Sequence, residues 1–287
     1  MSKAKTTQWV ELESPWSWQP GLVRIAKTSE DLTHDDLLRS ASRNELRQPY
    51  IFETELERRL HFTHDATQSA MKIDDPDALV AHYTRKMMAC LLFNPNPKHI
   101  VMIGMGGGSL PKFCYRHLSH TRITVVEVSA DAIAMRDEFL IPKDDQRFRV
   151  VHDDGARFIE SLTDDVDILL VDAFDADGIA LSLANSTFYS RAAAQLSKEG
   201  ILVMNFWGVP ERYVDNLALA RAAFGERVLL VPVAGESNLL MFAFKKPVPQ
   251  TITERLEFIA RRLQFDLLLD FPRYLSRICQ GHSLVGG

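Results

Sequence analysis

Several acidic residues of this chain follow short apolar stretches, where their carboxylates could meet a ligand. Glu127 lies in TRITVVEV, Asp154 comes shortly after FRVVH, and Asp172 and Asp175 lie in VDAFDADG. The carboxyl ends of parallel strands meet at one edge of a sheet, so we expect these acids to gather there and attract cations. Asp172 is the most telling, because an acid at the end of an apolar strand is costly unless it is paired or functional.

A glycine-rich segment, IVMIGMGGGSL, precedes these acids at residues 100–110. Glycine inside a strand or helix costs about 0.5–1 kcal/mol relative to alanine, so the cluster indicates a sharp turn or a close approach to a ligand. A strand followed by glycines and a helix lets backbone N–H groups approach a bound nucleotide. We therefore predict that Gly104, Gly106, Gly107 and Gly108 bind a cofactor. Glycines that serve only helix packing are the alternative.

The spacing of two acids suggests specific partners on such a cofactor. Glu127 follows the glycines by roughly 20 residues, a separation typical of a carboxylate that accepts the hydroxyls of an adenosine ribose. Asp154, followed by Gly155, could accept a hydrogen bond from an adenine amino group. Capping of the next helix is an equally simple role for Asp154.

The elements that must position these residues alternate between strand and helix. Nearly continuous apolar runs are typical of strands covered on both faces, and we predict strands at HIVMIG, TRITVVEV, FRVVH, VDILLVDAF, GILVMNF, RVLLVPV and LLMFAF. Helices are predicted at residues 110–118, 130–139, 156–162, 186–196 and 211–224. This alternation predicts an α/β fold with a doubly wound, mostly parallel, seven-stranded sheet. Its last two strands, separated only by AGESN, should form an antiparallel hairpin, as in a methyltransferase-like sheet rather than a dehydrogenase sheet.

The chain before and after this unit is predicted in less detail. We divide the whole sequence into an N-terminal tail with a small β region, residues 1–75, and a catalytic domain, residues 76–287. Strands are expected at 50–54, 59–63 and 68–73, and helices at 76–93 and 251–269. The exposed strand edges of the β region favour pairing across a two-fold axis, so we expect a homodimer.

Composition narrows the possible partners. The 287 residues include 33 Lys and Arg and 38 Asp and Glu, so a formal charge of −5 gives no reason to expect a nucleic-acid or membrane partner. Neither a membrane span nor the apolar core of a signal peptide is present, and three separated cysteines favour a cytoplasmic setting. The histidines form no metal-ligand motif, so we expect no metal.

The ordered set of motifs resembles a known family. NPNP, the glycine-rich loop, VVEV, DG and VDAFDADG followed by STFY are similar to the spermidine synthase family of aminopropyltransferases, within the class I S-adenosylmethionine-dependent methyltransferase fold. The resemblance spans roughly residues 66–245. It implies transfer of an aminopropyl group from decarboxylated S-adenosylmethionine to a diamine such as putrescine, a small-molecule amine substrate.

The resemblance also implies a role for individual residues. Glu127 would hold the ribose, Asp154 the adenine, and Asp172 would accept a proton from the attacking amine, with Asp175 as the second carboxylate that holds the diamine. Gln68 and Tyr83 would form walls of the amine site. Arg85 is a further wall candidate.

One position departs from the family pattern. The family's glycine loop usually carries an Asp that binds the amino group of the aminopropyl arm, and Gly107 stands in its place. That loss removes a discrimination between the decarboxylated cofactor and intact S-adenosylmethionine. An S-adenosylmethionine-dependent methyltransferase acting on a small molecule is therefore the main alternative. A nucleotide-binding dehydrogenase and a non-catalytic binding module are weaker ones.

Overall fold

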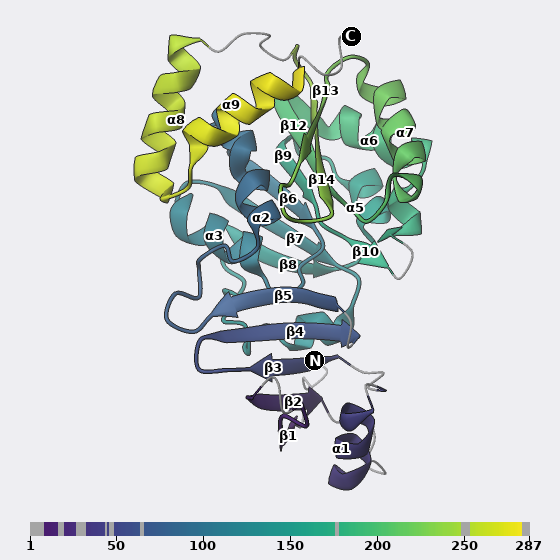
Figure 1. Cartoon of the computed structure of the whole chain (residues 1–287). Coiled ribbons are helices and arrows are strands. Elements are labelled where there is room, and N and C mark those ends of the chain that lie inside the picture. The colour runs from purple at the N-terminus through teal and green to yellow at the C-terminus, as the bar shows by residue number, and fades with distance from the viewer. Residues whose placement is uncertain are drawn as a thin grey trace.

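A seven-stranded sheet lies at the centre of the molecule, in the order β13-β14-β12-β9-β6-β7-β8 (Figure 1). The computed structural model describes residues 9–16, 20–26, 33–43, 45, 49–63, 66–175, 178–247 and 253–282. The strands of this main sheet are β6 (His99–Ile103), β7 (Arg122–Glu127), β8 (Phe148–His152), β9 (Val166–Val171), β12 (Leu196–Trp207), β13 (Val228–Pro232) and β14 (Asn238–Phe244). Neighbours from β12 to β8 are parallel, whereas β14 is antiparallel to β12 and β13. The predicted sheet and its closing hairpin are confirmed.

Helices cover both faces of the main sheet (Figure 1). One face carries α2 (His82–Met87), the short 3-10 helix η1 (Met88–Leu92), α3 (Ser109–His117), α8 (Glu254–Leu267) and α9 (Phe271–His282). The other face carries α5 (Gly155–Ser161), α6 (Ser186–Gln195) and α7 (Val214–Phe224). Because side chains alternate along a strand, Ile100 and Met102 join the apolar cluster of the first face and Val101 and Ile103 that of the second. None of the helices that the structure describes is long and apolar enough to cross a membrane.

Two predicted helices are shorter in the structure. The helix expected at 130–139 ends early, as α4 (Ala130–Ala134), because the chain turns so that Phe139 is fully buried and its carbonyl accepts a hydrogen bond from Lys112 Nζ at 2.9 Å. The helix expected at 76–93 begins only at His82. The carboxylate of Glu236 accepts hydrogen bonds from the first backbone N–H groups of α2 and fixes its start.

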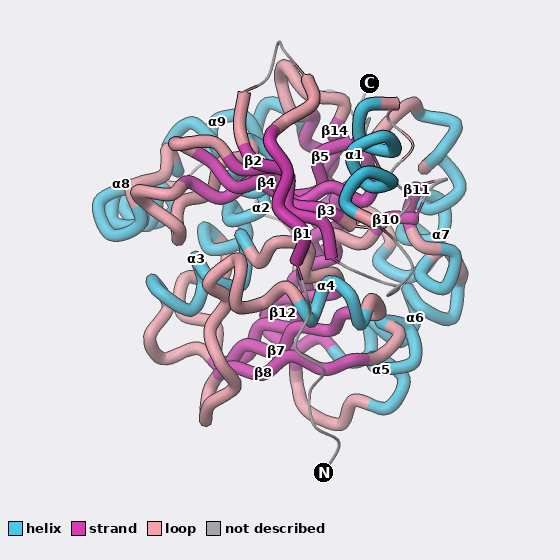
Figure 2. Tube along the Cα trace, turned by 90° about the horizontal axis from the view of Figure 1, so that it is seen from below, coloured by secondary structure: helices cyan, strands magenta, loops and turns pink. Residues whose placement is uncertain are grey.

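A five-stranded antiparallel sheet precedes the main sheet in the chain, in the order β1-β2-β3-β4-β5 (Figure 1). Figure 2 shows the molecule from below, with the strands of this sheet in the foreground. Its strands are β1 (Trp9–Glu13), β2 (Leu22–Ala26), β3 (Tyr50–Glu53), β4 (Glu57–Thr63) and β5 (Ala66–Lys72), with α1 (His34–Ser42) beside it. The three strands expected from residue 50 onward are confirmed. The first two strands and α1 lie where the sequence suggested no element. Of the sheet's five strands, β5 lies nearest to the main sheet (Figure 1).

Short elements complete the described chain. They are the paired strands β10 (Phe174–Asp175) and β11 (Gly178–Ile179), and the 3-10 helices η2 (Leu181–Leu183) and η3 (Pro210–Arg212). The helix expected at 211–224 is α7, preceded by η3, and the one expected at 251–269 is α8. The sequence did not predict α9, which packs against the same apolar cluster as α8 through Phe271.

Candidate functional site

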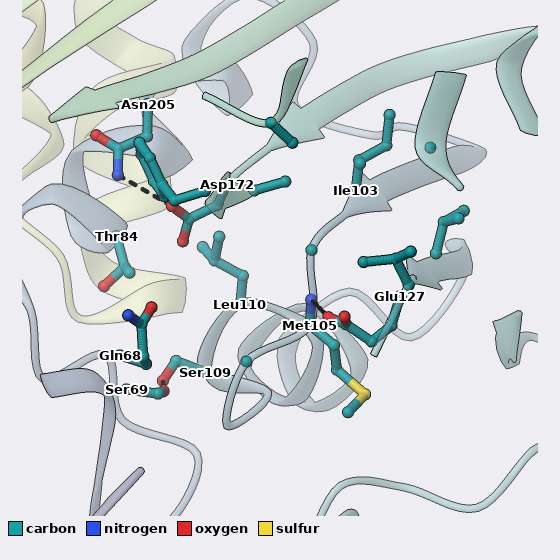
Figure 3. A pocket seen from close by; sticks show the side chains of 18 of the residues that line it. Gln68, Ser69, Thr84, Ile103, Met105, Ser109, Leu110, Glu127, Asp172 and Asn205 are labelled. Atoms are coloured by element: carbon teal, nitrogen blue, oxygen red, sulfur yellow. Dashed lines mark hydrogen bonds between the residues drawn. The ribbon is translucent and has the colours of Figure 1, made fainter. Parts of the chain in front are cut away.

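A cavity of about 480 Å³ opens at the carboxyl ends of β6, β7, β9 and β12. Side chains of β5 form part of its wall, so the N-terminal sheet contributes to the same site (Figure 3). Two groups of residues stand apart in this view: Glu127 with Met105 on one side, and Asp172 with Asn205 on the other. We call these the Glu127 end and the Asp172 end of the cavity.

The glycine loop brings three strand ends together. Gly104 follows β6 with φ of 92°, and a β-carbon there would lie 2.2 Å from the carbonyl oxygen of Asp172. Its N–H donates to the carbonyl of Val126 at 2.9 Å, and the Asp172 N–H donates to the carbonyl of Ile103 at 2.9 Å. Only glycine fits this close, left-handed turn, which explains one of the predicted glycines in structural terms.

Glu127 is fixed by the backbone at the end of β7. Its side chain is 8% exposed, Oε2 accepts a hydrogen bond from Met105 N–H at 2.8 Å, and Oε1 accepts one from Ser129 N–H at 2.7 Å. A carboxylate has about four acceptor positions, so two remain for hydroxyl groups of a ligand. Glu127, Gly104 and Gly106 all line the cavity, and their contact with a cofactor stays a prediction.

Asp154 caps α5 and also lines the cavity. Its Oδ1 accepts hydrogen bonds from the N–H groups of Ala156 and Arg157, each at 3.0 Å. Burial acts to raise the pKa of Asp154, but hydrogen bonds from Arg157, Ser182 and Ala156 outweigh it and the pKa is lowered. The capping alternative is therefore observed. Gly155 allows α5 to begin against Ile103, whose Cγ2 lies 2.4 Å from the place of a β-carbon.

The other two glycines face the walls of the protein. A β-carbon on Gly107 would lie 2.8 Å from Ser69 Oγ and 3.0 Å from a ring carbon of Phe139, and one on Gly108 would meet Ile141. Neither glycine lines the cavity, so a direct contact with a cofactor stays a prediction for both. Beside Gly107, Ser69 Oγ and Ser109 Oγ are 3.2 Å apart and both residues line the cavity.

Asp172 lies at the centre of a side-chain network. Tyr83 Oη donates to Asp172 Oδ2 at 3.0 Å. Asn205 Nδ2 donates to Asp172 Oδ1, also at 3.0 Å (Figure 3). Burial raises the pKa of Asp172, against the lowering effect of these two hydrogen bonds. Burial and the neighbouring Asp172 together raise the pKa of Tyr83 well above its ordinary value. A half-buried carboxylate with raised pKa is suited to accept a proton from a cationic ligand.

Three residues that the sequence analysis did not single out complete the Asp172 end. Asn205 is 1% exposed, and its Oδ1 accepts a hydrogen bond from Asn238 Nδ2 at 3.0 Å. The Glu236 carboxylate accepts a hydrogen bond from the Tyr83 backbone N–H at 3.2 Å. Asn205, Glu236 and Asn238 all line the cavity. A polar residue inside the apolar run GILVMNF was a usable signal for Asn205. Nothing in AGESN marked Glu236 or Asn238.

The remaining predicted residues have mixed outcomes. Gln68 and Tyr83 line the cavity, whereas Arg85 does not and instead donates to the carbonyls of Leu79 and Val80. The backbone of Asp175 belongs to β10, but its side chain lies outside the described residues.

The charge of the cavity wall is one-sided. Its acidic members are Glu127, Asp153, Asp154, Asp172 and Glu236. Among the described residues that line it, there is no Lys, Arg or His. A wall of this kind favours ligands that carry positive charge. The described part of the chain contains no group of His, Cys, Asp and Glu side chains placed to hold a metal ion.

Comparison with known proteins places the chain among relatives of similar length. Residues 77–211 match the spermine/spermidine synthase domain family. The chain is 33% identical over 231 residues to a polyamine aminopropyltransferase of Chromobacterium violaceum, an alignment that covers 80% of this chain and 88% of the relative.

Solved structures share the fold. The spermidine synthase of Thermotoga maritima superposes with a TM-score of 0.64 at 16% identity, over 96% of this chain and 92% of that one. A spermidine synthase in complex with the transition state analogue AdoDATO also gives 0.64 at 16% identity, over 97% and 94%. These likenesses confirm the methyltransferase-like sheet with a smaller N-terminal antiparallel sheet.

Proposed function

The chain belongs to the spermine/spermidine synthase family, and on that premise we propose that it transfers an aminopropyl group from decarboxylated S-adenosylmethionine to a diamine such as putrescine. The observation that carries the proposal is the half-buried Asp172, held between Tyr83 and Asn205 in a cavity whose described wall has acids and no basic side chain. Both proposed substrates are cations, so they suit this wall.

Asp172 supplies the base in the proposed reaction. Aliphatic amines are protonated at neutral pH, with pKa values near the roughly 10.4 of lysine. Asp172 accepts one ammonium proton, and the freed nitrogen lone pair forms a bond to the carbon beside the sulfonium. The carbon–sulfur bond breaks, its electron pair stays on sulfur, and neutral 5′-methylthioadenosine leaves. Orientation of the two substrates supplies much of the remaining rate enhancement.

The Glu127 end is the proposed donor site. Glu127 has acceptor positions left for the ribose hydroxyls, and Asp154, which lines the same cavity, is the proposed partner of the adenine. In place of the loop carboxylate that the family resemblance implies, Ser69 and Ser109 offer a neutral pair of hydroxyls to the donor's amino group. The acidic wall disfavours the additional carboxylate of intact S-adenosylmethionine, so we propose the decarboxylated form as donor.

The Asp172 end is the proposed acceptor site. Gln68 and Tyr83 line it, and Asp175 is the proposed second carboxylate for the distal ammonium.

We also propose a cytoplasmic homodimer that pairs through an exposed edge of the N-terminal sheet, without a nucleic-acid or membrane partner. Sedimentation of the purified protein tests the dimer, and a monomer at all concentrations contradicts it.

Product analysis tests the reaction itself. The protein is incubated with decarboxylated or intact S-adenosylmethionine and with diamines of increasing length, and the nucleoside and amine products are identified by mass spectrometry. We expect 5′-methylthioadenosine and an aminopropylated diamine only with the decarboxylated donor. Formation of S-adenosylhomocysteine and a methylated amine would instead establish methyl transfer and overturn the proposal.

A further inference from the structure

Three polar side chains form a series of hydrogen bonds in which each donor points toward Asp172. Asn238 Nδ2 donates to Asn205 Oδ1 at 3.0 Å, and Asn205 Nδ2 donates to Asp172 Oδ1 at 3.0 Å. In the β12–β14 pair Asn205 lies opposite Leu240, so Asn238, two residues away, lies on the same face of the sheet. The contact therefore follows from the register of the hairpin that closes the main sheet.

The direction of these hydrogen bonds bears on the charge of Asp172. An ionised carboxylate only accepts hydrogen bonds, so Asn205 must turn its NH₂ group toward Asp172 and its oxygen away. Asn205 is 1% exposed, and its oxygen is satisfied by the NH₂ group of Asn238. If Asn238 could not donate, a flipped Asn205 amide would present an oxygen to the Asp172 carboxylate and disfavour its ionised form.

The same hairpin holds the other donor to Asp172. Glu236 accepts hydrogen bonds from the N–H groups of His82 at 3.1 Å and Tyr83 at 3.2 Å, and Tyr83 donates to Asp172 Oδ2. Glu236 lies in the hairpin turn, two residues before Asn238, which is the first residue of β14. One short segment thus positions both side chains that contact the Asp172 carboxylate.

We infer that Asn238 is a positioning residue that orients the Asn205 amide and thereby sets the proton affinity of Asp172. The importance of this role for catalysis rests on the proposed function, whereas its effect on the pKa of Asp172 does not. Tyr83 is the titratable side chain that contacts Asp172 among the described residues, Glu236 lies by the Tyr83 backbone, and Glu127, Asp153 and Asp154 line the rest of the cavity.

Titration of Asp172 tests the inference without any substrate. The full-length protein carries ¹³C-labelled aspartate, the Asp172 carboxyl signal is assigned by its loss in Asp172→Asn, and its pKa is measured by NMR. Asn238→Asp keeps the shape but accepts instead of donating, so we expect the Asp172 pKa to rise by about one to two units. Asn238→Leu, which removes the donor without adding charge, should raise it by a smaller amount.

Two controls separate orientation from added charge. Ser237→Asp places a carboxylate on the adjacent residue, which is exposed and outside the cavity wall, and should leave the Asp172 pKa within about 0.3 units, since exposed charges are screened. In an Asn205→Leu background, Asn238→Asp should lose most of its effect, because the amide that transmits it is gone. Thermal melts confirm that each variant is folded.

The outcomes distinguish this inference from the proposed function. An unchanged Asp172 pKa in folded Asn238→Asp, or an equal rise in Ser237→Asp, overturns the positioning role. If the pKa rises as expected but the wild type forms no aminopropylated product, the proposed function fails and the inference stands. When both hold, the acid limb of the pH profile of kcat/KM should move to higher pH by the same interval in Asn238→Asp.

Discussion

The two ends of the cavity hold their carboxylates in different ways. Each oxygen of Glu127 accepts a hydrogen bond from a backbone N–H, of Met105 or Ser129, next to a strand end. Each oxygen of Asp172 accepts one from a side chain, of Tyr83 or Asn205. Backbone donors belong to the fold and change little with sequence, whereas side-chain donors can be exchanged. The Glu127 end is therefore suited to hold an invariant group, and the Asp172 end can be tuned.

Asp172→Asn should give the largest effect and should break the proton-accepting role alone. The amide can still accept from Asn205 and donate to the Tyr83 oxygen, so the network survives with one charge removed. A lost general base typically costs 10²–10⁴-fold in rate, and we expect a drop of about that size in kcat for aminopropyl transfer. Affinity for the nucleoside product 5′-methylthioadenosine, measured by calorimetry, should stay within about twofold because Glu127 is untouched.

The same variant has a stability consequence of definite sign. Burial raises the pKa of Asp172, so the folded state binds more protons than the unfolded state at acidic pH, and the stability from this group is lost as pH rises through the folded pKa. At neutral pH the ionised Asp172 thus lowers stability, and Asp172→Asn should melt at the same temperature or higher. The difference in melting temperature between Asp172→Asn and wild type should be more positive at pH 7 than at pH 4. A smaller difference at pH 7 would contradict this account.

The contrast between the two ends explains what the sequence could predict. Glu127 and the glycines lie in one continuous stretch, so strand pattern and spacing located them together. Asp172 was found for the same reason, at the end of an apolar strand. Its partners Tyr83 and Asn205 come from α2 and β12, and Asn205 in turn accepts from Asn238 of β14. Only the fold brings these three positions together. The register that places Asn238 beside Asn205 leaves no local mark in the chain.

Tertiary contacts also override the local pattern near the glycine loop. The helix predicted over residues 130–139 ends at Ala134 because Phe139 packs beside Gly107 and its carbonyl accepts a hydrogen bond from Lys112. The Gly107 departure was visible in the sequence. That Ser69 fills the space beside it was not, since β5 reaches the loop only through the packing of two sheets.

Glu127→Ala should give the next largest effect and tests whether the Glu127 end binds the donor. Loss of charge-assisted hydrogen bonds to the ribose should weaken binding of decarboxylated S-adenosylmethionine by about 1–3 kcal/mol. Calorimetry measures this, with Asp131→Ala as control because Asp131 is a nearby exposed acid outside the cavity wall. Equal affinity in wild type and Glu127→Ala would remove the ribose assignment, while the Asp172 titration should be the same in both.

Gly107→Asp sharpens the comparison by placing a carboxylate where the family resemblance expects one. Alone it should be destabilising, because its β-carbon would lie 2.9 Å from Ser69 Cβ. Ser69→Gly removes the two contacts shorter than 3.0 Å and leaves only the Phe139 ring carbon to adjust, at 3.0 Å. The double variant should prefer the decarboxylated donor over intact S-adenosylmethionine about tenfold more than wild type does. Gly107→Ala with Ser69→Gly is the uncharged control. Competition binding measures the preference, and equal preference in both double variants would refute the argument.

Lys112→Met should have the smallest effect on catalysis and a clear effect on stability, since Lys112 supports the segment under the glycine loop. Burial lowers the pKa of Lys112 from 10.5 to about 8, so between these values the unfolded chain binds more protons than the folded one. Wild-type stability should therefore gain an increment as pH rises from about 8 to 10.5, of at most about 3 kcal/mol, and lose it as pH falls again. Urea denaturation at a series of pH values should show a flatter profile for Lys112→Met than for the exposed control Lys143→Met. Parallel profiles would mean that burial does not lower the pKa of Lys112, and would contradict this account.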